Sequence, residues 1–124
     1  MWDKAKAVEH LDKHALAQSA GRCAQFVRQA IEAGGVVLVR HLSAKDYGPS
    51  LTMVGFVAMP PSVVLTPAAG DVGVVQPIPG HPDGHMAMFD GTLWVSDFKQ
   101  MHGLYPGPKY RELKPPFTVY RSPG

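Results

Sequence analysis

Apolar residues in the first third of the chain recur at helical spacing in two separate segments. Asp3 is a residue type that caps helices, and we expect a helix from there to about Ala17. Its buried face would carry Ala7, Val8, Leu11 and Ala15. Residues 18–21 interrupt this spacing and predict a break.

The second helical segment begins near the only cysteine of the chain. Ser19 is a candidate N-cap, and Gly34 with Gly35 would end the helix. The apolar positions follow the spacing i, i+3, i+4, i+7, i+8 and comprise Cys23, Phe26, Val27, Ala30 and Ile31. Cys23 is therefore expected in the first turn of a helix, on the side that faces the core, where a substrate cleft could reach it.

The rest of the chain changes to short segments separated by glycine and proline. Residues 36–39 suit a strand or a loop, residues 43–54 predict a helix interrupted near Gly48 and Pro49, and residues 55–66 predict a loop. We expect a turn and strand at 69–76, strands at 84–89, 92–98 and 117–121, and loops at 77–84 and 99–116. Asp90 and Gly91 form a hairpin signal. Helices followed by an antiparallel sheet predict the α+β class, in one domain spanning residues 1–124.

The composition fits a globular chain that is made in the cytoplasm. Apolar residues make up 45% of the 124 positions and charged residues 18%, which excludes a disordered chain. One cysteine cannot form an intramolecular disulfide. The N-terminus lacks the apolar core of a signal peptide, and no run approaches the roughly 18 apolar residues of a membrane span. We therefore expect no membrane insertion, and we assign no cofactor.

The net charge of +2 is concentrated late in the chain. Between positions 99 and 121 the acidic residue is Glu112, whereas five residues are cationic: Lys99, Lys109, Arg111, Lys114 and Arg121. Such a segment is either an ordinary solvated face or a surface with weak attraction for an acidic partner. Because these residues are not interleaved with a nucleic-acid motif, nucleic acid is not an expected partner.

Cys23 is the main candidate for chemistry. A helix macrodipole places about half a positive charge near a residue in the first turn, which favours the reactive thiolate, and Arg22 could add to this effect. A lone cysteine is otherwise most often a small buried apolar residue. The helix-start position, the lead-in by Gly21 and Arg22, and a downstream glycine–histidine strand favour a nucleophile.

Two histidines compete for the role of the general base. His85 begins an apolar strand that can hold its ring rigidly, whereas His81 lies in a loop beside Pro82, so we favour His85. Residues 81–85 (HPDGH) also contain metal-ligand types. Proline and glycine exclude the helical spacing of zinc proteases, and no third ligand is evident, so we assign no metal.

The third catalytic residue should hold the far ring nitrogen of the histidine. With a hairpin turn centred near residue 91, the partner of His85 falls near Asp97, which we predict to be the orienting residue. Ser96 and Gln76 are the alternatives. An oxyanion could be bound by the backbone N–H of Cys23, with Gln18 as a weaker candidate donor.

At these residues the chain resembles papain-like peptidoglycan amidases of the CHAP and NlpC type. The similar segments are residues 19–28 (SAGRCAQFVR), 70–76 (GDVGVVQ) and 84–88 (GHMAM). With residues 43–50 (SAKDYGPS) and 94–100 (WVSDFKQ), the chain more closely resembles the third family of type VI secretion amidase effectors. This resemblance covers nearly the whole chain.

The resemblance implies a papain-like NlpC/CHAP-type fold and a bacterial toxin. Such a toxin would leave the producing cell through the type VI secretion machinery and cut peptide stems of peptidoglycan in a rival's periplasm. A cognate periplasmic immunity protein would protect the producer. Similar members are associated with the D-alanine–diaminopimelate cross-link. A housekeeping or phage-derived lysin and a catalytically silent peptide-binding module are the alternatives.

Overall fold

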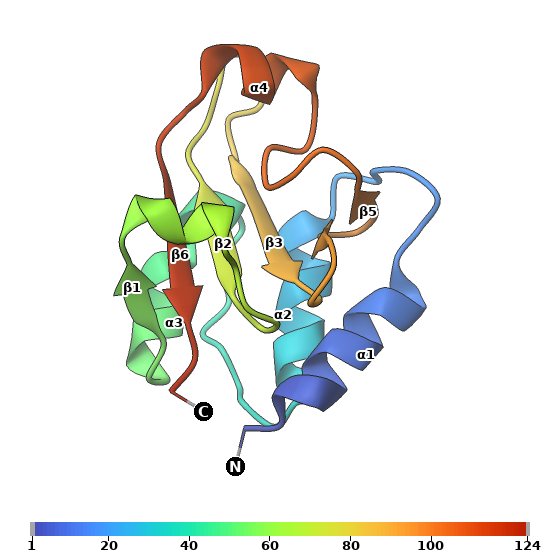
Figure 1. The fold of residues 1–124 in the computed structure, drawn as a ribbon, viewed down its shortest axis with the longest axis vertical. Helices are drawn as coiled ribbons and strands as arrows, with labels where there is room; N and C mark the ends of the chain where they lie inside the picture. The colour runs from blue at the N-terminus through green and yellow to red at the C-terminus, as the bar shows by residue number, and fades with distance from the viewer. Residues whose placement is uncertain (1, 124) are drawn as a thin grey trace.

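Most helical residues precede a six-stranded sheet along the chain, and one short helix lies between the last two strands (Figure 1). The computed structural model describes residues 2–123. The helices are α1 (Lys4–His14), α2 (Cys23–Ala33), α3 (Gly48–Met53) and α4 (Pro108–Leu113), with 3-10 turns η1 (Ala44–Asp46) and η2 (Pro61–Leu65). The strands are β1 (Val57–Met59), β2 (Val72–Val75), β3 (His85–Phe89), β4 (Trp94–Val95), β5 (Lys99–Gln100) and β6 (Phe117–Arg121). The predicted α+β class is confirmed.

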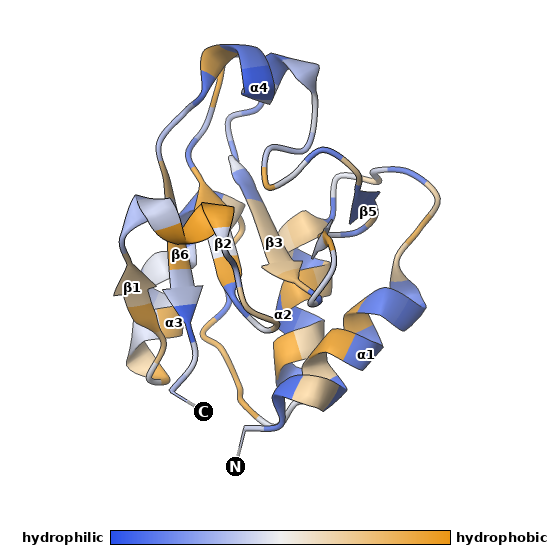
Figure 2. Cartoon of the chain, viewed as in Figure 1, coloured by the Kyte–Doolittle hydropathy of each residue, from blue (hydrophilic) through white to orange (hydrophobic). Residues whose placement is uncertain are grey.

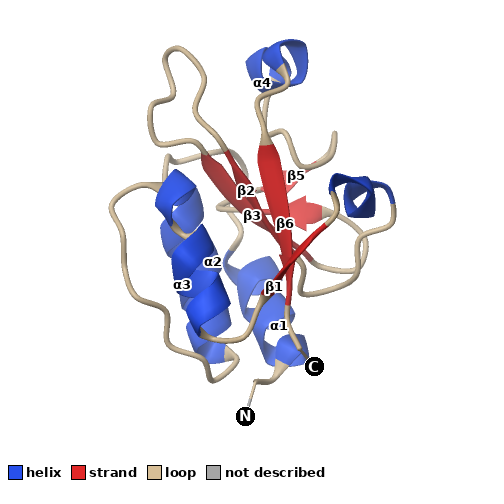
Figure 3. Cartoon of the chain, turned by 90° about the vertical axis from the view of Figure 1, so that its left-hand side faces the viewer, coloured by secondary structure: helices blue, strands red, loops and turns tan. Residues whose placement is uncertain are grey.

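The sheet is antiparallel throughout, in the order β1-β6-β2-β3-β4-β5. The central strands β2 and β3 pair with Val75 opposite His85. The same side of the sheet carries α2, which packs on β3, and α3, which packs on β6 (Figure 3). Cys23 and His85, the first residues of α2 and β3, lie at the same end of these two elements, because both line one pocket.

Both faces of the central strands are buried, because each is covered by apolar residues from other elements (Figure 2). Val72, Val74, Met86 and Met88 share one core with residues of α1 and α2. The alternate residues Val75 and Ala87 share a second core with Leu104 and Tyr110. Because successive side chains of a strand point to opposite faces, one sheet contributes residues to two cores.

The two N-terminal helices were predicted correctly, but their ends differ in detail. The Asp3 carboxylate accepts a hydrogen bond from the Lys6 amide at 3.0 Å, which confirms the cap, and α1 ends at His14. The expectation that Ser19 caps the second helix is wrong. The N-cap is Arg22, which makes no capping hydrogen bond through its side chain, and α2 begins at Cys23.

The strands predicted within 69–76, at 84–89 and at 117–121 are present as β2, β3 and β6, and further elements were missed. β1 and η2 lie inside the expected loop 55–66, and β5 and α4 lie inside the expected loop 99–116. The expected strand at 92–98 is reduced to Trp94–Val95, because the chain turns back at 96–98 to form β5. Within residues 2–123, no helix is long and apolar enough to cross a membrane.

Candidate active site

Cys23 and His85 line the same cleft. Its volume is about 450 Å³, and its other walls come from the loop around His81 and from residues 106–110. Gly84 allows the chain to pass close to β2 just before His85, because its backbone has φ +71° and a Cβ there would lie 2.3 Å from the Val75 carbonyl oxygen. Only glycine satisfies both demands, so Gly84 fixes the position of His85 at the start of β3.

Backbone amides of both α2 and β3 favour the charged form of the Cys23 sulfur. The backbone amide of Met86, which directly follows His85, acts to lower the pKa of the thiol, as do those of Ala24 and Cys23 itself. Burial nevertheless raises the pKa of the thiol to about 11, with a smaller contribution from the negative charge of Asp97. The expectation that the helix N-terminus favours thiolate is therefore outweighed by desolvation.

The ring of His85 is held by a glutamine. Its Nε2 lies 2.6 Å from Oε1 of Gln100, and both side chains are buried. The Gln100 amide nitrogen donates to the carbonyls of Gly103 and Leu104, each at 2.9 Å, which fixes the orientation of the amide. Since Oε1 can only accept, His85 must carry its proton on Nε2, and Nδ1 is the basic ring nitrogen.

Burial also controls the charge of His85. Desolvation lowers the pKa of the imidazole to about 4, although the hydrogen bond to Gln100 and the charge of Asp97 act in the opposite direction. The exposed His81, whose charge also lowers this pKa, lies on the same cleft. At neutral pH the resting pair is thus an uncharged thiol and an uncharged imidazole.

Asp97 does not occupy the predicted position. Its buried carboxylate accepts hydrogen bonds from the amides of Ala20 and Arg22 at 2.8 and 2.9 Å. Its backbone carbonyl accepts from Leu16 at 2.7 Å. The prediction that Asp97 contacts the His85 ring is wrong. Gln100 makes that hydrogen bond, and Asp97 instead holds the segment that leads into α2.

The register of the sheet explains this error. Met88 pairs with Val95 and Phe89 with Trp94, so the continuation of this register would place residue 98, not Asp97, opposite His85. A shift of one residue moves a side chain to the other face of a sheet. The chain then turns, and Gln100 pairs with Trp94. Gln100 ends the segment 94–100 that carried the resemblance, but beyond this it had no sequence signal except a polar side chain in a region expected to be a loop.

The remaining candidates are distributed as follows. The Ser96 hydroxyl contacts the carboxylate of Asp97 at 3.4 Å, and Gln76 and Gln18 are exposed. His81 lines the cleft with its ring centroid 5.4 Å from that of Tyr110. In residues 2–123, no group of three or more His, Cys, Asp or Glu side chains is placed to hold a metal ion.

Two solved structures are similar to nearly the whole chain. One, described as the native type VI effector–immunity complex Tae3-Tai3 from Ralstonia pickettii, is 51% identical, with a TM-score of 0.91 over 98% of this chain and 99% of that chain. The selenomethionine form of that complex is 52% identical, with a TM-score of 0.87 over 94% and 99%. No protein-family model matches the sequence, and no curated protein matches it.

Proposed function

Because the chain belongs to Tae3, the third family of type VI secretion amidase effectors, we propose that it hydrolyses peptide cross-links of peptidoglycan with Cys23 as nucleophile. The observation that carries the proposal is that one cleft is lined by a thiol at the start of α2 and by an imidazole whose Nε2 is engaged by Gln100. This arrangement leaves Nδ1 of His85 as the acceptor for the thiol proton.

The proposed reaction has two halves. As the sulfur attacks the carbonyl carbon of the scissile amide, Nδ1 of His85 takes the thiol proton, and the backbone N–H of Cys23 faces the developing oxyanion. The imidazolium then protonates the leaving amine, which departs and leaves a thioester on Cys23. A water molecule gives a proton to Nδ1, attacks the thioester and releases the new carboxylic acid and the thiol.

The uncharged resting pair suits this sequence of steps. Because burial raises the pKa of Cys23 and lowers that of His85, proton transfer to the histidine accompanies attack instead of preceding it. We further propose that the bond cut is the D-alanine–diaminopimelate cross-link. The protein would be made in the bacterial cytoplasm and delivered by the type VI secretion machinery to the periplasm of a target cell.

Digestion of purified sacculi tests the proposal. The wild-type protein should convert cross-linked dimers to monomers, and Cys23→Ala should abolish this activity while retaining the circular dichroism spectrum of the wild type. His85→Ala should be inactive, whereas His81→Ala should retain activity. A folded Cys23→Ala protein that still digests sacculi would refute the mechanism, and an inactive His81→Ala with an active His85→Ala would assign the base to His81.

A cognate immunity protein is the second proposed partner, since both similar structures are described as effector–immunity complexes. We propose that it closes the cleft, because an open cleft would expose the nucleophile to the producer's own wall. Lys109 lines the cleft, and Arg111 follows in α4. Charge steering at this rim would accelerate association more than it deepens affinity. Arg111→Glu should therefore slow association and weaken its salt dependence in stopped-flow measurements, and salt-independent association of the wild type would refute steering.

A further inference from the structure

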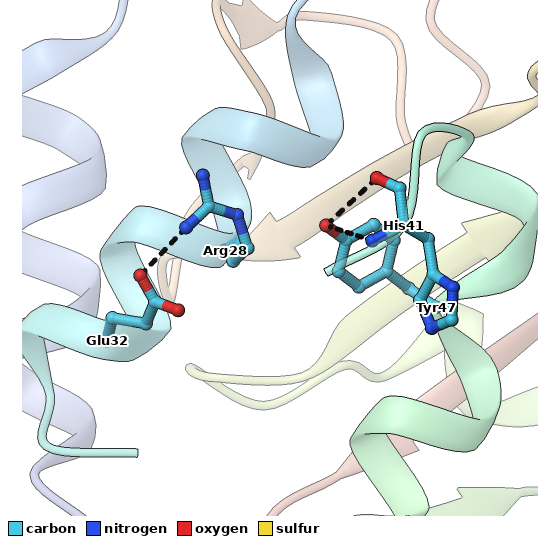
Figure 4. Close-up of polar contacts among 4 residues, drawn as sticks. All are labelled: Arg28, Glu32, His41 and Tyr47. Atoms are coloured by element: carbon cyan, nitrogen blue, oxygen red, sulfur yellow. Dashed lines mark hydrogen bonds and ion pairs between the residues drawn. The ribbon is translucent and has the colours of Figure 1, made fainter. Parts of the chain in front are cut away.

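The cleft continues past Cys23 into a second hollow between α2 and residues 40–47. This hollow has a volume of about 410 Å³ and shares Gly21, Cys23 and Asp83 with the first. Figure 4 shows Arg28 and Glu32 on α2 and His41 and Tyr47 in the facing segment. A peptide that crosses the sulfur would therefore place one side of its scissile amide in the first hollow and the other side here.

The second hollow is lined by cations. Arg22, Arg28 and Arg40 line it, and Asp83 is the only acidic residue among its lining residues. One oxygen of Asp83 accepts a hydrogen bond from the Ser43 hydroxyl at 2.6 Å. Arg22 and Arg40 are exposed, so they present their charge at the rim. An anionic group is the ligand that this set of charges favours.

Arg28 differs from the other two because it is fixed in place. It is only 8% exposed, and its Nη1 donates to Glu32 Oε1 at 2.9 Å, one turn along α2 (Figure 4). A guanidinium has five N–H donors in a planar fork, and this ion pair uses only one of them. Arg28 is therefore a partly neutralised donor held against the hollow, whereas Arg40 supplies additional charge.

The facing wall is also rigid. The Tyr47 hydroxyl accepts from the His41 amide at 3.2 Å and donates to the His41 carbonyl at 3.3 Å. His41 Nε2 lies 2.7 Å from the Ser50 hydroxyl, which donates to the Val39 carbonyl at 2.9 Å. The backbone on both sides of Arg40 is thus fixed by buried groups, and a site that is already formed loses less entropy on binding.

Resting on the proposed function, we propose that this arginine-lined hollow binds the carboxylate that flanks the scissile amide of the cross-link. In a D-alanine–diaminopimelate bond, the carbon attached to the leaving nitrogen carries a free carboxylate. Arginine forks bind carboxylates through paired, charge-assisted hydrogen bonds. Arg28 and Arg40 would hold that group, place the scissile carbonyl over Cys23 and select free diaminopimelate over its amidated form.

Two matched substrates test this proposal: a purified cross-linked muropeptide dimer and the same dimer with that carboxylate converted to an amide. The wild type should cleave the acid with a kcat/KM about 10- to 100-fold above that of the amide, the range expected for hydrogen bonds to a charged group. Arg40→Gln should lose most of this preference by losing activity on the acid alone. Arg28→Lys keeps the charge but loses the fork, and should do the same.

Lys13→Gln, an equal change of charge at the end of α1, is the control and should retain the wild-type preference. Equal cleavage of both substrates by the wild type would overturn the inference while leaving the proposed amidase activity intact. Equal losses on both substrates in Arg40→Gln would also overturn it. If the wild type cleaves neither dimer, the proposed function is refuted, and this inference with it.

Discussion

Replacing Gln100 with alanine removes three hydrogen bonds at once, two of them buried. Gln100 is 2% exposed, accepts from His85 Nε2 and donates to the carbonyls of Gly103 and Leu104. The Gly103 residue is exposed, so water can replace its bond, but the ring N–H and the Leu104 carbonyl would remain buried without this partner. The change therefore affects both the orientation of the base and the stability of the β5 region.

The expected magnitudes follow from the cost of an unsatisfied buried group, about 1–3 kcal/mol each. For the ring of His85, this cost corresponds to a loss of about one to two orders of magnitude in kcat, because each 1.36 kcal/mol changes a rate tenfold. The free energy of unfolding should fall by about 2–4 kcal/mol. Because the bond to Gln100 raises the pKa of His85, its removal should shift the acid limb of the activity profile to lower pH.

The assay is the initial rate of dimer cleavage between pH 3.5 and 8, with urea unfolding measured on the same preparations. Gln76→Ala is the matched control, since Gln76 is an exposed glutamine just beyond β2. The shift of the acid limb separates an effect on the histidine from simple loss of folded protein. A Gln100→Ala protein with an unchanged rate and pH profile, beside an impaired Gln76→Ala protein, would refute the assignment of Gln100.

Three further predictions concern other parts of the site. The pKa of Cys23 is about 11, against 9.0 for an unperturbed cysteine, so iodoacetamide at pH 7 should alkylate Cys23 about 100-fold more slowly than a free thiol. Mass spectrometry measures this rate, and a rate equal to that of a free thiol would contradict the buried thiol. Gly84→Ala should lower the urea midpoint of unfolding far more than Gly80→Ala. Gly80 has φ +86° but no atom within 4 Å of a new Cβ, so its replacement should cost about 1 kcal/mol. Equal losses in the two variants would refute the close approach of Gly84 to Val75. Asp97→Asn should lower stability by about 1 kcal/mol through weaker bonds to the two amides it holds, with activity reduced but present, and a stable, inactive variant would give Asp97 a catalytic role.

Much of the fold could be predicted from local patterns. Asp3 caps α1, the apolar spacing places Cys23 in the first turn of α2, and the strand that begins at His85 lies where its apolar run indicated. These features depend on the chemistry of neighbouring residues, which is written within a few positions of the chain. The α+β class and the two residues that line the cleft together, Cys23 and His85, could therefore be predicted from the amino-acid sequence alone.

The partners of those two residues were decided by tertiary structure. Gln100 reaches His85 because β4 and β5 have two residues each and the chain turns back between them, and no periodic signal can be read from segments that short. The same turn places Asp97 beneath the segment before α2 instead of beside the histidine. The charge state of the pair also follows from burial: a helix start favours thiolate locally, but desolvation by the assembled sheet and helices raises the pKa of the thiol. Burial depends on the packing of distant segments, so it is a property that only the folded chain determines.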